Sequence, residues 1–196
     1  MQTVSRVYDT YAQANQAVSD IEGAGVPSSE VSLVANKYVS DKYDNVESVS
    51  KAGTGAGIGG VLGGGAGLLA GLGLLAIPGL GPVVAAGWLA SLAVGAAAGA
   101  TAGGLVGALV SAGTSDDHAH VYSESVRRGG TLVSVRVADE DDASAIQALL
   151  DRHGPIDPVE RGAEYRATGW ATFDPKAPPY KPSESEIERI RRDRAA

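Results

Sequence analysis

The sequence predicts an α+β protein: a ferredoxin-like split βαβ sandwich interrupted by a long Gly-rich apolar helical hairpin. Two strand–helix–strand patterns lie at opposite ends of the 196-residue chain, and they match each other at a constant offset. A run without any ionisable residue separates them. We therefore expect four parts: residues 1–51, 52–113, 114–161 and 162–196.

The first half of the predicted sandwich begins with a strand over residues 2–8, which are rich in β-branched and aromatic side chains. Residues 10–24 predict an amphipathic helix, because apolar residues recur at helical spacing: Tyr11, Ala14, Val18 and Ile21. Gly25 ends this helix. Residues 30–35 predict a second strand, so this half has the order strand, helix, strand.

The second half repeats that order after an additional helix, which begins at the N-cap residue Ser115 and reaches about Arg128. Residues 131–138 are the clearest strand in the chain, and residues 140–152 form an amphipathic helix. A short edge-like strand is expected over residues 156–161. Residues 162–182 predict an extended tail whose aromatic residues dock on the domain or on a neighbour, before a short charged helix at the C-terminus.

The two halves resemble each other residue by residue. The constant offset aligns four pairs of residues: Ala14 with Ala143, Ala17 with Ile146, Ile21 with Leu150, and Gly25 with Gly154. Two such units predict a four-stranded antiparallel sheet with its helices on one face.

The segment between the halves is of another composition. The run from Ala52 to Ser115 contains no Asp, Glu, Lys, Arg or His, and it holds 20 of the 27 glycines. A turn is expected from its composition at Pro78, Gly79, Gly81 and Pro82. As helices, the arms 52–77 and 83–113 would each exceed the roughly 30 Å of a bilayer core.

Small residues recur every fourth position in both arms and so form one stripe along each predicted helix. These residues are Gly55, Gly59, Gly63, Gly67 and Gly71 in the first arm, and Gly87, Ser91, Gly95, Gly99, Gly103 and Gly107 in the second. Such stripes let helices approach closely in lipid, so we predict that they carry helix packing and oligomerisation. The second arm is small on most faces, which favours a homo-oligomer.

Composition excludes several functions. The chain has no cysteine, three histidines and a net charge of −7, which argue against a zinc site and against nucleic-acid binding. The pattern Gly55-x-Gly57-x-x-Gly60 lacks the preceding strand and the later carboxylate of a dinucleotide site. No nucleophile with a base stands out, so we predict no catalytic residue, no cofactor and no metal.

Four passages of the sequence resemble one bacterial family: V-x-x-V-Y-D near the N-terminus, GLLAGLGLLAIPGLGPVVAAGWLA, VYSESVRRGGTLVSVRV, and YRATGWATFDP. The chain is similar over nearly its whole length to bacterial proteins with a general-stress-protein 17M-type domain. The resemblance implies a stress-associated, non-enzymatic protein, and it implies no catalytic residues and no mechanism.

Three functions follow as expectations. The first is a membrane-associated structural protein in the cytoplasmic membrane, with the polar domain facing the cytoplasm and the hairpin in the lipid bilayer. The second is a large soluble cytoplasmic assembly that sequesters its hairpins around a lipid-like interior or another hydrophobic guest. The third is a pore, against which stands the lack of ionisable residues to line a water path. A small-ligand enzyme or sensor on the ferredoxin-like sheet is a further alternative, which nothing in the sequence supports beyond the fold. The specific protein partner is left open.

Overall fold

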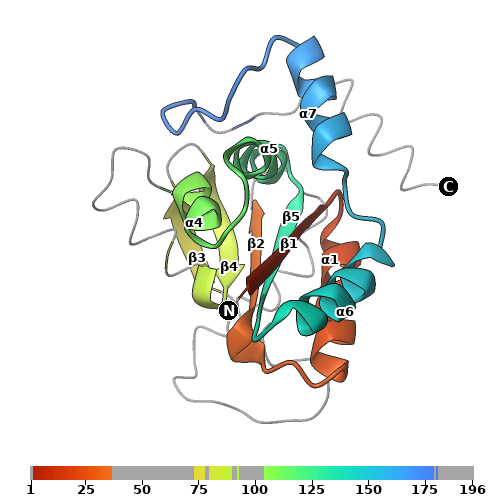
Figure 1. The fold of residues 1–196 in the computed structure, drawn as a ribbon. Helices are drawn as coiled ribbons and strands as arrows, with labels where there is room; N and C mark the ends of the chain where they lie inside the picture. Colours follow the sequence, from red (N-terminus) through yellow and green to blue (C-terminus); the bar gives the residue numbers. More distant parts are fainter. Residues whose placement is uncertain are drawn as a thin grey trace, which may run out of the picture.

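The computed structural model describes residues 2–36, 73–77, 80–89, 92, 104–178 and 180. At its centre is a five-stranded antiparallel sheet of order β1-β5-β2-β4-β3, with helices packed around it (Figure 1). The α+β class predicted from the sequence is confirmed.

The polar parts of the chain supply one side of the sheet, the adjacent strands β1, β5 and β2. β1 (Gln2–Tyr8) is followed by α1 (Tyr11–Gly23), a short 3-10 turn η1 (Ser28–Glu30) and β2 (Val31–Asn36). β5 (Thr131–Val137) lies between β1 and β2 and runs antiparallel to both. β1 and β2 are therefore parallel to each other. The connection between them contains α1 and passes over β5, which comes from the second half of the chain.

The charge-free segment supplies the other end of the sheet. β3 (Gly73–Ile77) and β4 (Gly81–Ala86) form a hairpin, and β4 pairs with β2, so β3 is the outermost strand. The prediction of helical arms is wrong over these residues. Val83 and Ala85 are buried on one face of the sheet and Ala86 on the other, which is the two-residue period of a strand.

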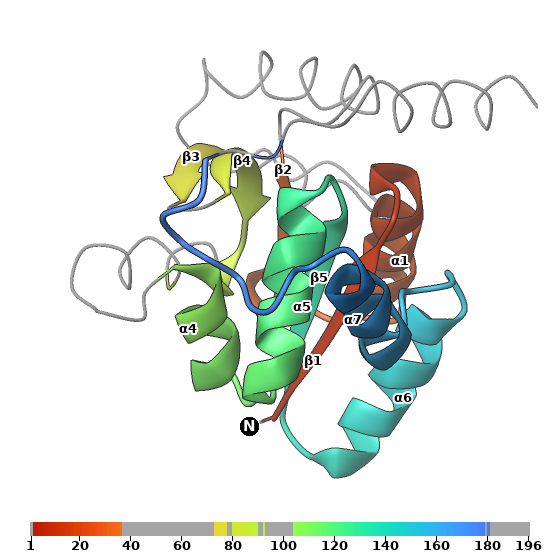
Figure 2. The same cartoon turned by 90° about the horizontal axis from the view of Figure 1, so that it is seen from above.

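Helices cover both faces of the sheet, whereas the sequence predicts helices on one face only. α1 and α6 (Glu140–Asp151) pack on one face, around Ile21, Val133 and Leu150. α4 (Leu105–Ser111) and α5 (Asp116–Arg127) pack on the other, around Val34, Leu109 and Leu132 (Figure 2). The sequence predicts α5 as a helix but does not place it on this second face, because its neighbour α4 belongs to the segment predicted as the hairpin.

The strand predicted over residues 156–161 is replaced by a helix, α7 (Pro158–Ala167). Oδ1 of Asp157 accepts hydrogen bonds from the N–H groups of Val159 (2.7 Å) and Glu160 (3.0 Å), and Pro158 occupies the first turn. These backbone hydrogen bonds lower the pKa of Asp157. A good helix start therefore prevails over the weak strand pattern.

The segment after α7 returns across α5 (Figure 2). Phe173 is 3% exposed and belongs to the core under α4 and α5, and Trp170 packs edge-on against Tyr165 with ring centroids 5.7 Å apart. The backbone N–H of Trp170 donates to the carbonyl of Tyr165, with 3.2 Å between nitrogen and oxygen. The aromatic residues of the tail therefore dock on their own chain, but the extended conformation predicted from residue 162 is wrong as far as Ala167, which ends α7.

The prediction of membrane-spanning helices is wrong for the described residues, where no helix has the length and apolar character needed to cross a bilayer. α4, a helix in the second arm, has 7 residues and so is only about 10 Å long.

Candidate functional site

Most residues that the sequence singles out for helix packing lie outside the described residues. These are Gly55, Gly59, Gly63, Gly67, Gly71, Ser91, Gly95, Gly99 and Gly103, together with Pro78 and Gly79 of the turn. A glycine zipper at these positions stays a prediction. Four of the predicted residues can be placed: Gly81, Pro82, Gly87 and Gly107.

Gly81 and Pro82 open β4. Gly81 pairs with Ile77 and Pro82 with Ala76, and the N–H of Leu80 donates to the carbonyl of Ile77 at 3.1 Å. The chain therefore does reverse here, but between two strands. Composition alone could not distinguish a turn between strands from a turn between helices.

Gly87 is a point of close approach between β4 and β2. Its φ is +85°, and a Cβ at this position would overlap the carbonyl oxygen of Val31 and lie 2.7 Å from the Cα of Ser32. The next residues stay on β2, since Leu89 N donates to Ser32 Oγ at 2.8 Å. Glycine is thus required here because the backbone of β2 lies too close for a Cβ and because φ is positive.

Gly107 does lie on a helix, in the middle of α4, where it is half-buried. α4 buries Leu105, Ala108 and Leu109 against the sheet and α5, and its Val110 is 41% exposed. The small residue therefore belongs to a short helix that is packed within the domain.

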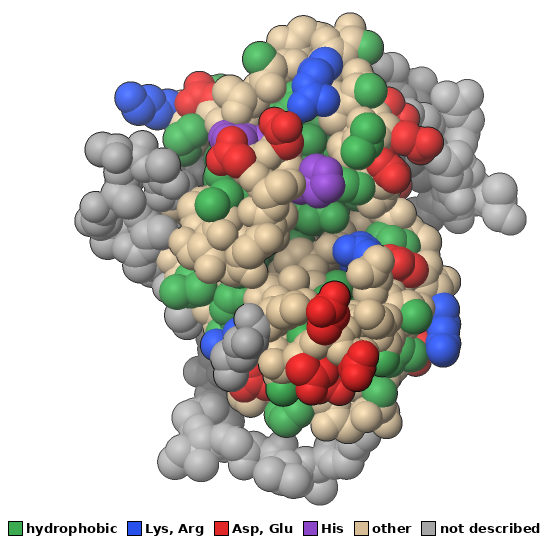
Figure 3. Space-filling model, viewed as in Figure 1, with side chains coloured by type: hydrophobic (Ala, Val, Ile, Leu, Met, Phe, Trp, Pro, Cys, Tyr) green, Lys and Arg blue, Asp and Glu red, His purple; other side chains and the backbone are tan. Residues whose placement is uncertain are grey.

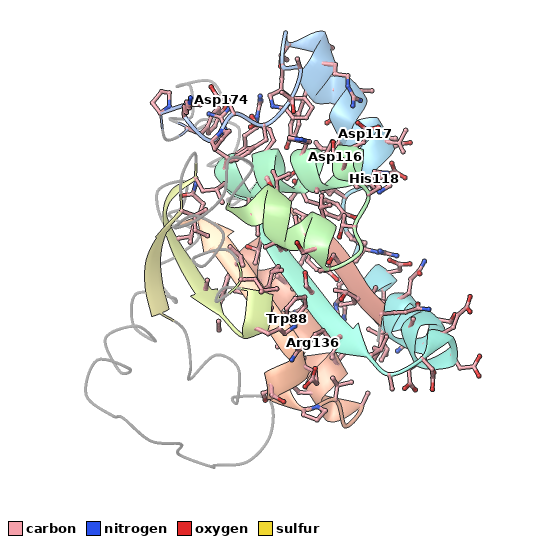
Figure 4. The ribbon with its side chains drawn as sticks, turned by 60° about the vertical axis from the view of Figure 1, so that its left-hand side comes forward. Trp88, Asp116, Asp117, His118, Arg136 and Asp174 are labelled. Carbon is pink, nitrogen blue, oxygen red and sulfur yellow. The ribbon has the colours of Figure 1, made fainter. Side chains whose placement is uncertain are left out.

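A stacked pair of side chains, Arg136 and Trp88, links β5 to the residues that follow β4. The Arg136 guanidinium lies over the Trp88 ring, 4.8 Å from its centroid (Figure 4). Arg136 Nε also donates to Glu30 Oε2 at 2.8 Å, and Trp88 Nε1 donates to the carbonyl of Glu30 at 3.1 Å. The charge-free segment is thereby attached to the start of β2 and to β5.

A buried carboxylate joins α5 to α7 and the tail. Glu124 is 1% exposed and accepts hydrogen bonds from Arg127 and Arg128, at 2.7 and 2.6 Å. The hydrogen bond to Glu124 raises the pKa of Arg127. The Arg128 guanidinium lies 4.3 Å from the ring centroid of Tyr165 and 5.3 Å from that of Tyr180. The arginines are thus neutralised in part and stacked, and they hold the second helical layer together.

The start of α5 carries the acids and histidines that the sequence places close together. Asp116, Asp117 and His118 lie near α7 (Figure 4), and within the described ranges no group of three ligand side chains could hold a metal ion. His120 Nδ1 is 2.9 Å from Thr172 Oγ1, while Asp116 Oδ2 lies 3.7 Å from His120 Nε2. At this distance the Asp116–His120 contact is longer than a hydrogen bond, and the Asp116 side chain is 77% exposed.

The two edges of the sheet differ. On β1, the Val7 carbonyl accepts from Ile156 N at 2.8 Å, and the Ser5 carbonyl accepts from Arg6 Nη1 at 3.0 Å and from Tyr122 Oη at 3.4 Å. On β3, no described residue pairs with the side away from β4. Sequence reasoning misses this contrast because the composition of the segment does not assign β3 to a sheet.

Charge is distributed just as unevenly. Acidic side chains gather over α6 on the face seen in Figure 3, where Asp139, Glu140, Asp141 and Asp142 are all exposed. By contrast, β3, β4 and α4 contain no ionisable residue. The sheet edge formed by β3 is therefore built from two neighbouring strands, β3 and β4, that carry no charged side chain.

No protein-family model, no curated protein and no solved structure matches this chain. The geometry of the described residues therefore carries the functional interpretation.

Proposed function

We propose that this chain is a non-enzymatic protein that assembles into homo-oligomers through its charge-free segment, residues 52–115. The observation that carries the proposal is the place of this segment in the fold. It adds β3 and β4 to the sheet, so that a strand from a long run without charge forms one edge of the domain.

The charge balance supports self-association at this segment. All 39 acidic and basic residues lie outside it, and the net charge is −7. Two copies that approach through their polar parts meet like charges, whereas the charge-free segments meet without that repulsion. An apolar run of this size also gains by being removed from water.

The architecture around the segment supports the finer prediction of a ferredoxin-like domain. β1 and β2 are parallel with β5 between them, as in a split βαβ unit, and the hydrogen bond from Ile156 N to Val7 O lies where a fourth strand would begin. We infer that β3, β4 and α4 extend such a domain at the opposite side. Membership in the stress-protein family stays a prediction.

The proposal is tested by introducing charge into the part of the segment that lies outside the described residues. We expect the full chain to sediment as an oligomer in detergent-free buffer, and the double variant Gly59→Glu with Gly67→Glu to shift toward monomer. The matched control places the same two charges in the preceding polar stretch, as Asn45→Glu with Ser48→Glu, and should sediment like the unchanged chain.

A monomeric full chain at all concentrations up to about 100 μM would refute self-association, since that range covers weak but specific contacts. An equal shift for both double variants would show that net charge, rather than the charge-free segment, sets the assembly.

A further inference from the structure

We propose that the open edge of β3 pairs with β3 of a second copy of this chain, which gives one continuous sheet across a two-fold axis. This inference rests on the proposed self-association and assigns it to one strand. It would make the sheet edge the contact that fixes how two copies are oriented.

The choice of edge follows from how the two ends of the sheet are closed. β1 is protected at its outward carbonyls, since those of Ser5 and Val7 already accept hydrogen bonds from side chains and from the Ile156 N–H. Arg6, which lies between these two residues in β1, also forms an ion pair with Asp151, with 2.6 Å between Nε and Oδ1. A charged residue held at an edge in this way is a common means of preventing strand addition.

β3 has none of these protections among the residues that the structure describes. Its sequence, GLLAI, contains no charge and no proline, and its partner β4 occupies only one side. Among the described residues, none pairs with the N–H and C=O groups on its other side, and we infer that these groups accept another strand. An edge of this kind takes an extended segment by main-chain hydrogen bonding.

A second copy is the partner that best fits this edge. Antiparallel pairing of β3 with itself about a two-fold axis uses the same groups on both copies, as in an isologous interface. The net charge of −7 opposes most other mutual approaches, while the strands that meet here carry no ionisable residue. The sheet order places β1, with its charged Arg6, at the far end of each domain.

Disulfide cross-linking provides a direct test, because the chain contains no cysteine. Single cysteines are placed along the strand as Leu74→Cys, Leu75→Cys and Ala76→Cys, with Thr3→Cys in β1 as the matched edge control. A residue near the two-fold axis faces its own copy at about 4.5–5.5 Å between Cα atoms, which a disulfide can bridge. We expect a covalent dimer for one or two neighbouring β3 positions and none for Thr3→Cys.

A second variant measures the energetic contribution of the edge. Leu75→Lys places a charge on both strands at the contact, so the dissociation constant of the dimer should rise at least tenfold in sedimentation experiments. Thr3→Lys, at the closed edge, should leave it unchanged. Circular dichroism of both variants establishes that their secondary structure is retained, and the cysteine series does not depend on that variant.

The outcomes separate this inference from the proposed function. Oligomers that show no cross-link at β3 and no response to Leu75→Lys would overturn the pairing while leaving self-association through another part of the segment. A chain that stays monomeric and shows no cross-link would overturn both. Cross-linking at β3 together with loss of the dimer in Leu75→Lys would support both.

Discussion

The hydroxyl groups of Ser5 and Ser134 lie 2.8 Å apart in the interior of the sheet, and the two residues are cross-strand partners in the β1–β5 ladder. Their separation in the sequence equals the offset that relates the two halves of the chain, as Ile21 is related to Leu150. Each serine is thus paired with its own equivalent, and a pseudo-two-fold axis passes between them. The same offset relates the N-caps Thr10 and Asp139, and the positive-φ glycines Gly25 and Gly154.

Removing one hydroxyl of this pair should destabilise the fold by about 1–2 kcal/mol, because the other hydroxyl is left buried without its partner. We expect Ser5→Ala and Ser134→Ala each to lower the free energy of unfolding by this amount in urea titrations. The double variant should cost less than the sum of the two, since no unsatisfied hydroxyl remains. The exposed Ser29→Ala serves as control, and strict additivity would show that the two hydroxyls do not interact.

The repeat and the central elements are predictable because local signals agree with the tertiary structure. The strands expected over residues 2–8 and 131–138 and the helices expected over 10–24 and 140–152 are all confirmed, with small differences at their ends. In α1 and α6, the residues that are apolar at helical spacing are the buried ones, including Ile21 and Leu150. Periodicity is informative where one face of an element packs on a core and the other meets water.

The same argument explains why sequence reasoning misses β3 and β4. Their segment is apolar or small at nearly every position, so neither a two-residue nor a 3.6-residue period emerges from it. A continuous apolar run is compatible with a strand that is covered on both faces. β4 is such a strand, since its Ala86 is buried in the core on one face of the sheet and its Val83 in the core on the other. The β-branched pair Val83-Val84 is the one local signal for a strand.

Glycine at position 87 offers a test of why small residues recur in this segment. Gly87→Ala should destabilise the chain by more than Gly113→Ala, although both glycines have a positive φ, of +85° and +96°. At Gly113 no atom lies within 4 Å of an added Cβ, so only backbone strain of about 1–2 kcal/mol applies. At Gly87 the Cβ also collides with the backbone of β2.

Thermal unfolding of the two variants measures this difference directly. A lower melting temperature for Gly87→Ala than for Gly113→Ala is expected at any protein concentration. If Gly87→Ala instead changed only the oligomeric state and left the melting temperature equal to that of Gly113→Ala, packing between helices of different copies would be the better explanation for this glycine.

The buried carboxylate of Glu124 should contribute more to the free energy of unfolding than the exposed carboxylate of Glu164, which is paired with Arg161. Glu124→Gln leaves Arg127 and Arg128 without their shared anion in a largely buried position, so we predict a loss of about 2–3 kcal/mol in the free energy of unfolding. Glu164→Gln removes the partner of Arg161 at 3.1 Å, but that carboxylate is 70% exposed. Its loss should cost less than about 1 kcal/mol. Equal losses in urea titrations would contradict a special role for the buried group.

The last prediction concerns which part of the charge-free segment the domain needs. Removing residues 52–113 deletes β3, β4 and α4, and with them six large side chains of the second core: Ile77, Leu80, Val83, Leu89, Leu105 and Leu109. At about 1.5–3 kcal/mol for each buried side chain, this loss is comparable to or larger than the roughly 5–15 kcal/mol of a typical domain. The shortened chain should therefore unfold without a cooperative transition.

Removing residues 52–70 alone should have the opposite result. Asn36 and Leu75 both lie beside Val83, so the strands to be joined are only about 10 Å apart, which is two strand spacings. The stretches 37–51 and 71–72 remain between them, and as an extended chain they can span several times that distance. We expect this chain to melt cooperatively. A cooperative transition in the chain that lacks residues 52–113 would instead mean that β3, β4 and α4 contribute little to the stability of the domain.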